Sequence, residues 1–362
     1  MSIQAAQRMG LRCLSLDPGL ITPASQIAES LNGAINDPMM IAEILRRCDR
    51  VTLENEFIPA DAIREALSLS GRSEDALVPG VDTLATIQDK LAQRRALIAA
   101  GVPSPRAVPI DDDGSLARVE IGFPMVLKAR FGGYDGKGTR YARNEEELAS
   151  HQALWASGGW LAEEFVPFRR EVSVMVAIDS SVSTAFPAME TVQANHVCDV
   201  TFPAAISPFG PSHAEDIARD AIRAVGGHGL FGVELFETSD GRLLVNEIAP
   251  RPHNTGHYTL DWGAPSQFDY HVRLAAGLPI IGSPVGSYVM MANLLGQAGA
   301  GDFRTGLRAM LSEFPDVRFH WYGKEEAKAG RKMGHINLVA EGYEDLERLR
   351  SAQAAFYEAW RL

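Results

Sequence analysis

The feature that most constrains this chain is a glycine-rich loop at residues 132–138, which follows a short apolar run at residues 125–127. Four glycines fall within seven residues, so backbone N–H groups can approach an oxyanion with no Cβ atom in the way. Lys137 adds a flexible ammonium, which suits a phosphate. The loop therefore predicts a lid over a polyphosphate, although a glycine-rich hairpin with surface lysines has the same composition.

Strand-like residues flank the loop on both sides. Residues 126–130 precede it and residues 139–143 follow it, so the loop is expected to lie inside a β-hairpin. Lys128 and Arg130 occupy alternate positions of the first strand and would point to the same face of a sheet. The chain contains neither G-x-x-x-x-G-K-[ST] nor a G-x-G-x-x-G that opens a helix after a strand. The pattern therefore predicts a phosphate-binding loop that matches neither of these two motifs.

Two acidic residues interrupt apolar, strand-like runs further along the chain. Glu234 lies within residues 231–236 and Glu247 within residues 244–248, with a turn at residues 239–241 between them. If the two runs pair across that turn, both carboxylates reach one face, where they need a cation to neutralise them. Mg²⁺ is the usual answer, because it takes one or two carboxylates and fills its other positions with ATP phosphates and water. Surface acids on an edge strand are the alternative.

Composition places the chain among ordinary globular proteins. Its 362 residues, 46% of them hydrophobic and 22% charged, allow two or three domains with their own cores. A formal net charge of −12 argues against a general nucleic-acid or membrane-surface binder. Three scattered cysteines, the lack of an apolar run near the ~20 residues of a membrane span, and the lack of a signal peptide predict a cytoplasmic protein.

The first 80 residues alternate between strand-like and helix-like segments, which predicts a doubly wound parallel sheet with helices on both faces. Ligands of such sheets bind at the carboxyl ends of strands, where Glu54, Asn55 and Glu56 fall. Solvated loop carboxylates explain these acids equally well. Because the chain begins inside a helix, the first strand of the doubly wound pattern is expected to be missing.

Two further helices have clear sequence signals. One long helix is expected over residues 82–100, where Gly101 and Pro103 stop it. The last helix carries an apolar face that would dock onto the body of the protein. The residues of that face are Leu346, Leu349, Ala352, Phe356 and Trp360.

Two clusters of donors follow the second acid. The first cluster comprises Arg251, His253, Asn254 and His257. Such a set can hold a carboxylate or phosphate oxyanion through charge-assisted hydrogen bonds. The second cluster comprises Lys324, Arg331, Lys332 and His335. Concentrated positive charge in an acidic chain suggests a phosphate-bearing substrate, with a solvated basic turn as the alternative.

Together these motifs resemble the N5-carboxyaminoimidazole ribonucleotide synthetase family, which belongs to the ATP-grasp superfamily and acts in purine biosynthesis. The resemblance runs in order from about residue 5 to about residue 340. The segments that carry it are residues 132–138 (GGYDGKG), 163–168 (EEFVPF), 171–174 (EVSV), 246–254 (NEIAPRPHN), 256–257 (GH), 322–324 (YGK) and 330–335 (GRKMGH). The last segments are more specific to this family than the glycine loop.

The resemblance implies a fold of mixed α/β and α+β class in three parts. These are a Rossmann-like pre-ATP-grasp domain over residues 1–80, an ATP-grasp domain over residues 81–285 with a lid subdomain at about 103–165, and a small C-terminal domain over residues 286–362. It also implies a reaction in which ATP phosphorylates bicarbonate to carboxyphosphate, which then carboxylates 5-aminoimidazole ribonucleotide. ATP and Mg²⁺ are the expected cofactors and a homodimer the expected assembly.

By the same resemblance, the candidate site residues fall into four groups. The ATP-binding group is Lys90, Lys128, Gly133, Tyr134, Asp135, Gly136, Lys137, Gly138, Thr139, Glu163, Glu164, Phe165, Val166, Glu171, Gln193, Asn246 and Glu247. Within it, the backbone of residues 163–166 would hold the adenine edge and its acids the ribose hydroxyls. The catalytic group is Arg251, His253, Asn254 and Lys324. The substrate-binding group is Glu54, Asn55, Glu56, His257, Lys324, Arg331 and Lys332, and the metal ligands are Glu234 and Glu247.

The chain departs from the family's pattern in two places. The family begins with a strand and a glycine-rich turn, and this chain is expected to start just after them. Gln193 stands where the family usually has a histidine, and glutamine can donate and accept hydrogen bonds but cannot titrate near neutral pH. Two other interpretations remain: another ATP-grasp ligase, such as a formate-using transformylase or a carboxylase, and a nucleotide-binding homologue impaired in catalysis.

Overall fold

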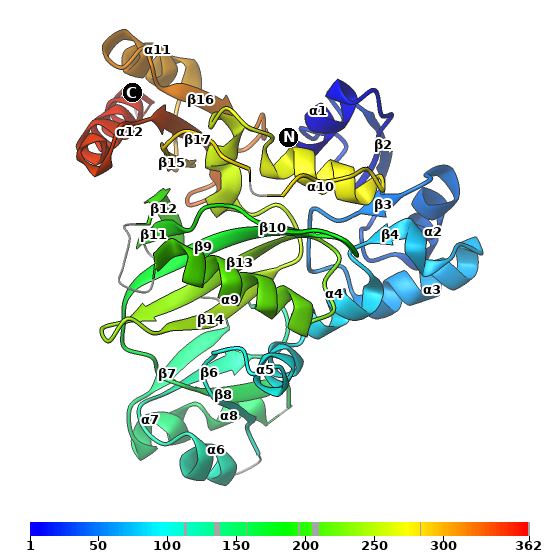
Figure 1. The fold of residues 1–362 in the computed structure, drawn as a ribbon, viewed down its shortest axis with the longest axis vertical. Helices are drawn as coiled ribbons and strands as arrows, with labels where there is room; N and C mark the ends of the chain where they lie inside the picture. Colours follow the sequence, from blue (N-terminus) through cyan, green and yellow to red (C-terminus); the bar gives the residue numbers. More distant parts are fainter. Residues whose placement is uncertain are drawn as a thin grey trace.

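The computed structural model describes residues 1–111, 114–133, 138–156, 158–194, 196–204, 210–282 and 284–360. These residues form an N-terminal α/β region, a small four-stranded sheet, and a large antiparallel sheet that continues into the C-terminal region (Figure 1). The four-stranded sheet lies at one end of the molecule, and the N-terminal and C-terminal regions lie towards the other end (Figure 1).

The N-terminal region has the predicted alternation of strands and helices. Its elements are α1 (Ser2–Arg8), β1 (Leu14–Asp17), β2 (Glu29–Asn32), α2 (Pro38–Arg47), β3 (Val51–Thr52), α3 (Ala60–Ser70), the 3-10 turn η1 (Glu74–Ala76) and β4 (Leu77–Val78). The side chain of Asp37 caps α2 by accepting a hydrogen bond from the N–H of Met39 at 2.9 Å. Within the described residues, β1 pairs with β2 and β3 with β4, both in parallel. The predicted doubly wound pattern is thus present as two short parallel ladders.

The single helix predicted over residues 82–100 is wrong, because the structure has two helices, α4 (Val81–Gln88) and α5 (Lys90–Ala99). Asp89 separates them: its backbone is extended (φ −91°, ψ 100°), and its side chain caps α5 through the N–H of Leu91 at 3.0 Å. The same carboxylate accepts a hydrogen bond from Arg130 at 2.9 Å. A tertiary contact therefore holds the break, which places Lys90 at the start of α5.

The glycine-rich loop joins two strands of the four-stranded antiparallel sheet. That sheet has the order β5 (Ala107–Pro109), β8 (Trp160–Glu164), β6 (Met125–Ala129) and β7 (Thr139–Ala142), and the short helices beside it are α6 (Ser115–Glu120), α7 (Glu145–Ser150) and α8 (Gln152–Trp155). Met125, Leu127 and Leu148 form part of a shared buried core. The predicted strand–loop–strand arrangement is confirmed, with Lys128 opposite Thr139 in the β6–β7 register.

The large antiparallel sheet has nine strands in the described part of the chain. Its order is β14 (Leu243–Ala249), β13 (Gly229–Thr238), β9 (Phe168–Ile178), β11 (Met189–Ala194), β12 (Val197–Pro203), β15 (Val289–Leu295), β17 (Lys332–Val339) and β16 (Arg318–Trp321), and β10 (Ser183–Ala185) pairs with β9. The two faces of β9 belong to different cores. Val174 packs with residues of α9 (Gly210–Ala224), and its neighbour Met175 packs with residues of α10 (Gln267–Ala275) and of the 3-10 segment η2 (Asn254–Leu260).

The large sheet runs without interruption into the C-terminal region. Strands β12 and β15 are hydrogen-bonded at Val200↔Ala292 and Thr201↔Met291. The remaining C-terminal elements are α11 (Phe303–Glu313), the 3-10 turn η3 (Tyr343–Asp345) and α12 (Leu346–Trp360). The apolar face predicted for the last helix is confirmed, since all five of its residues are buried. None of the described helices is long and apolar enough to cross a membrane.

Candidate active site

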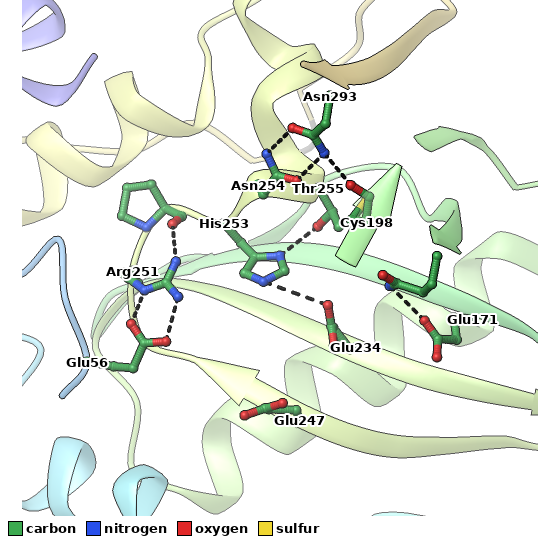
Figure 2. A network of polar contacts seen from close by, with 12 residues as sticks. Glu56, Glu171, Cys198, Glu234, Glu247, Arg251, His253, Asn254, Thr255 and Asn293 are labelled. Carbon is green, nitrogen blue, oxygen red and sulfur yellow. Dashed lines mark hydrogen bonds and ion pairs between the residues drawn. The ribbon is translucent and has the colours of Figure 1, made fainter. Parts of the chain in front are cut away.

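Glu234 and Glu247, here called the acid pair, are direct cross-strand neighbours. Glu234 lies on β13 and Glu247 on β14, and the antiparallel register places them opposite each other. Opposed residues of an antiparallel ladder point to the same face, so both carboxylates enter the same space (Figure 2). The strand pairing predicted across the turn at residues 239–241 is therefore confirmed.

The two members of the acid pair have opposite electrostatic environments. Their side chains remain partly open, 26% for Glu234 and 44% for Glu247. Burial, together with the charges of Glu247 and Glu171, raises the pKa of Glu234 to about 8. Burial also acts to raise the pKa of Glu247, but the ammonium of Lys90, 2.6 Å from its carboxylate, outweighs that effect and leaves the pKa below its usual range. No cation is paired with Glu234 among the residues that the structure describes, and two carboxylates on one face suit a divalent cation such as Mg²⁺.

Lys128 lies beside the acid pair on the facing strand β6. Its ammonium donates to Asn246 Oδ1 at 3.3 Å, one residue before Glu247, and forms an ion pair with Glu163. Burial lowers the pKa of Lys128, although the carboxylate of Glu163 opposes that shift. Lysines from α5 and β6 therefore converge on the acid pair from outside its own strands.

Glu163 sits at the centre of a buried triad with Arg94 and Lys128. Arg94 donates to the carboxylate of Glu163 and to the backbone oxygens of Val245 and Asn246, at 2.8 Å and 2.6 Å. Burial would raise the pKa of Glu163, but the two cations lower it to about 2. Both carboxylate oxygens of Glu163 are engaged by cations, Oε1 by Arg94 and Oε2 by Lys128.

A cleft of about 870 Å³ opens between the two sheets above the acid pair. The predicted residues that line it are Glu56, Lys90, Lys128, Gly133, Gly138, Thr139, Glu163, Glu164, Phe165, Val166, Glu171, Gln193, Glu234, Asn246, Glu247, Arg251, His253, Asn254 and Lys332. Gln193 donates to Glu171 at 2.8 Å, so these two members of the predicted ATP-binding group are in contact. Tyr134, Asp135, Gly136 and Lys137 lie outside the described residues.

Sequence analysis missed part of the cleft lining. Residues that it did not single out there include Arg169, Arg170, Glu190, Thr191, His196, Cys198 and Phe236. Arg170 pairs with Glu190 at 2.7 Å and with Glu237 at 2.6 Å, and Glu237 is almost fully buried. Most of these residues lie on strands, and a strand position alone does not tell a lining residue from any other strand residue.

The donors at residues 251–254 line the cleft beside the acid pair. Arg251 makes a two-point ion pair with Glu56, which links the N-terminal region to the end of β14 (Figure 2). His253 has its Nε2 3.7 Å from Glu234 and its Nδ1 2.9 Å from the hydroxyl of Thr255. Burial, with Arg251 nearby, lowers the pKa of His253 well below 6.5, so its ring is neutral.

Of the predicted members of the basic cluster, all of which the structure describes, only Lys332 lines the cleft. Lys324 donates instead to the backbone oxygen of Lys332 at 2.7 Å, and burial together with Arg331 and Lys332 lowers its pKa to about 8. Arg331 is exposed and donates to the carbonyl of Glu326. These cations lie close together, next to the cleft.

Three further predicted substrate residues have structural contacts outside the cleft lining. Glu54 accepts a hydrogen bond from Ser2, and Asn55 accepts one from the N–H of Phe57 at 2.9 Å. His257 is buried, its Nδ1 lies 2.8 Å from the side-chain nitrogen of Gln267, and burial lowers its pKa to about 3.

An acid pair on adjacent strands, a lysine from the facing sheet, a second lysine from α5 and a cleft between the two sheets are the features of an ATP-grasp enzyme. A family model described as the ATP-grasp domain matches residues 95–268. A model described as the ribonucleotide synthetase preATP-grasp domain matches residues 1–88, and one described as the phosphoribosylaminoimidazole carboxylase C-terminal domain matches residues 289–349.

Comparison with whole proteins narrows this class to one family. The N5-carboxyaminoimidazole ribonucleotide synthase of Synechococcus elongatus is 39% identical over 360 residues, which cover 98% of this chain and 90% of that protein. The phosphoribosylaminoimidazole carboxylase of Ogataea methanolica is 36% identical, and the match covers 96% of this chain but 66% of that longer protein. An Aspergillus clavatus N5-carboxyaminoimidazole synthase, solved in complex with ADP and 5-aminoimidazole ribonucleotide, has a TM-score of 0.87 at 28% identity over 99% of this chain and 95% of that one. The chain belongs to the N5-carboxyaminoimidazole ribonucleotide synthase family.

Proposed function

We propose that this chain is an ATP-dependent carbon–nitrogen ligase of purine biosynthesis. It carboxylates the exocyclic amine of 5-aminoimidazole ribonucleotide with bicarbonate and releases ADP and phosphate. The observation that carries the proposal is the acid pair in the cleft, flanked by Lys90 and Lys128, in a chain whose fold matches a structure solved with ADP and this ribonucleotide.

The reaction proceeds in two steps. An oxygen of bicarbonate attacks the γ-phosphorus of ATP, the bond to the bridging oxygen of ADP breaks, and carboxyphosphate forms. The amine nitrogen then attacks the carbonyl carbon, the carbon–oxygen bond to phosphate breaks, and the amine gives up a proton. A dry cleft is needed because water would otherwise consume the mixed anhydride.

Glu234 and Glu247 are the proposed Mg²⁺ ligands. Their shared face, and the raised pKa of Glu234, fit a divalent cation that would take up the unneutralised charge. When bound, Mg²⁺ would neutralise the charge that develops on the transferred phosphoryl group. Lys90 and Lys128 would act on the same charge, and Asn246 accepts a hydrogen bond from Lys128.

The rest of the ATP is proposed to lie along residues 163–166 and the glycine loop. The backbone of residues 163–166 would take the adenine edge, and Glu171, hydrogen-bonded to Gln193, the ribose. Thr139 and the glycine loop with Lys137 would cover the phosphates.

The substrate end of the cleft is proposed to begin at Arg251. Arg251, His253 and Asn254 would surround carboxyphosphate and the amine, since they lie on the cleft wall next to the acid pair. The ribonucleotide's 5′-phosphate would be held by the adjacent cations Lys324, Arg331 and Lys332.

The remaining proposals concern the organisation of the chain. We place the domain boundaries near residues 80 and 285, with the lid subdomain at about residues 103–165, and we propose a cytoplasmic homodimer. The three cysteines are all free, which supports a reducing compartment. Sedimentation at equilibrium tests the dimer.

The decisive experiment measures ADP and carboxylated ribonucleotide in the same reaction. The enzyme is incubated with ATP, Mg²⁺, bicarbonate and 5-aminoimidazole ribonucleotide, and each component is left out in turn. Equal amounts of ADP and carboxylated product, both absent without bicarbonate, are expected. Turnover with formate in place of bicarbonate would indicate a different ATP-grasp ligase. Thermal stabilisation by ATP without any ADP release would instead indicate a homologue that binds but does not catalyse.

A further inference from the structure

Asn293 forms a closed pair with Asn254 at the substrate end of the cleft. Asn293 lies on β15 and is fully buried. Its Nδ2 donates to Asn254 Oδ1 at 2.6 Å, and its Oδ1 accepts from Asn254 Nδ2 at 2.9 Å (Figure 2). The two residues belong to different parts of the chain, because Asn254 falls in the ATP-grasp match and Asn293 in the C-terminal match.

A third group determines which way the Asn293 amide points. Its Nδ2 also donates to the backbone oxygen of Cys198 at 2.8 Å. A carbonyl oxygen only accepts hydrogen bonds, so the nitrogen of Asn293, and not its oxygen, must face Cys198. That choice leaves the oxygen of Asn293 facing Asn254. The amide of Asn254 therefore has one allowed orientation, with its nitrogen towards that oxygen.

The backbone of Asn293 is held as firmly as its side chain. Its carbonyl accepts hydrogen bonds from the side-chain nitrogen of Gln353 at 2.8 Å and from the hydroxyl of Tyr357 at 3.4 Å, both on α12. Gln353 also donates to Asp199, the residue after Cys198. Hydrogen bonds thus join Asn293 to β12, to α12 and, through Asn254, to the cleft wall.

We infer that Asn293 is a positioning residue, which acts through Asn254 to align the substrate end of the site. Among the described contacts, the pair uses one of the two N–H groups of Asn254 and one of the two lone pairs on its oxygen. The other N–H group and the other lone pair remain for a ligand. Asn254 lines the cleft next to His253, so the free N–H would have a fixed direction there. The inference rests on the proposed function, in which Asn254 contacts carboxyphosphate or the attacking amine.

The expected consequence of losing Asn293 is uncoupling. A misaligned amide would still permit phosphorylation of bicarbonate, which depends on the acid pair, but it would delay capture of carboxyphosphate by the amine. Water would then consume part of the intermediate. ADP would form in excess of carboxylated product, and the KM for ATP would change little.

Two variants keep the shape of Asn293 and remove its donors. Asn293→Leu removes every side-chain hydrogen bond, and Asn293→Asp replaces the amide nitrogen that faces the carbonyl of Cys198 with an oxygen. Thr184→Val is the matched control, because it deletes one hydrogen bond of a buried side chain, to the carbonyl of Ile281, on β10 away from the cleft lining. The measurement is the ratio of ADP to carboxylated product, which does not depend on the fraction of enzyme that is folded.

We expect both Asn293 variants to raise the ratio at least about threefold, with a change in the KM for ATP below about twofold, while Thr184→Val leaves the ratio at the wild-type value. A double variant, Asn254→Leu with Asn293→Leu, separates positioning from a general structural role. If Asn293 acts through Asn254, the double variant has the same ratio as Asn254→Leu alone. The inference is overturned if both Asn293 variants stay coupled like wild type, or if the two effects multiply. A wild-type enzyme that makes no carboxylated product would refute the proposed function instead.

Discussion

The charge balance of the buried triad can be tested with Glu163→Gln. Glutamine keeps the shape of the carboxylate but not its charge, so Arg94 and Lys128 would remain as two cations without an anion between them. Both the Arg94 and the Glu163 side chains are 3% exposed, so water cannot take the place of the lost charge. We therefore expect a large loss of stability from a substitution that changes little in volume.

The size of the loss follows from the pKa of Glu163. The two cations hold that pKa at about 2, against 4.5 for a free glutamate, and this difference of ~2.5 units corresponds to roughly 3 kcal/mol. Removal of one partner from a buried ion pair independently costs about 3–5 kcal/mol. A loss of about 3 kcal/mol lowers the unfolding midpoint by roughly 6–12 °C for a cooperative unit of about 150–250 residues.

Thermal unfolding of the two proteins, followed by tryptophan fluorescence, gives the comparison. Glu43→Gln is the matched control, because Glu43 pairs with Arg46 at the surface and its loss is expected to change stability by less than about 0.5 kcal/mol. The pKa of Glu163 is depressed in the folded protein, so its contribution is complete above pH 4.5 and is lost as the pH falls towards 2. The gap between wild type and Glu163→Gln should narrow over that range. The reasoning is refuted if Glu163→Gln unfolds within 2 °C (about 0.5–1 kcal/mol) of wild type at pH 7.

Three further predictions concern activity. Glu247→Gln removes the acid paired with Lys90 and should lower the rate of ADP formation at least about 100-fold, measured with saturating Mg²⁺ and ATP. The pKa of Lys324 is lowered to about 8, so its ammonium is charged below that pH and neutral above it. The KM for the ribonucleotide should therefore rise about tenfold between pH 7 and 9, and Lys324→Arg should abolish that rise. Arg251→Lys cannot keep the two-point contact with Glu56, so the KM for bicarbonate should rise roughly tenfold. An unchanged KM would show that Arg251 does not contact the substrate.

Local patterns in the sequence were enough to predict the acid pair. Glu234 and Glu247 lie on strands that a short turn connects, so strand alternation and one hairpin fix their common face. The strand pairing around the glycine loop was predictable for the same reason. The apolar face of α12 followed from helical periodicity alone.

Contacts between distant segments were beyond the sequence patterns. Asp89 looks like any residue of a helix until Arg130, 41 positions later, binds its carboxylate. Arg94 cannot be told from Arg95 by spacing, and only the fold places it beneath Glu163. Asn293 gave no signal at all, because an asparagine in an apolar strand has meaning only when its partners are known.

Because of the β12–β15 ladder, the regions matched by the ATP-grasp and C-terminal family models cannot be separated without damage to the sheet. A cut in the connection at residues 269–288 would divide one sheet and leave β12 as a bare edge, with unpaired N–H and C=O groups open to other chains. A fragment ending there would be prone to self-association. Any attempt to transplant the nucleotide-binding region into another protein would have to include β15 and α12, the helix that packs against it.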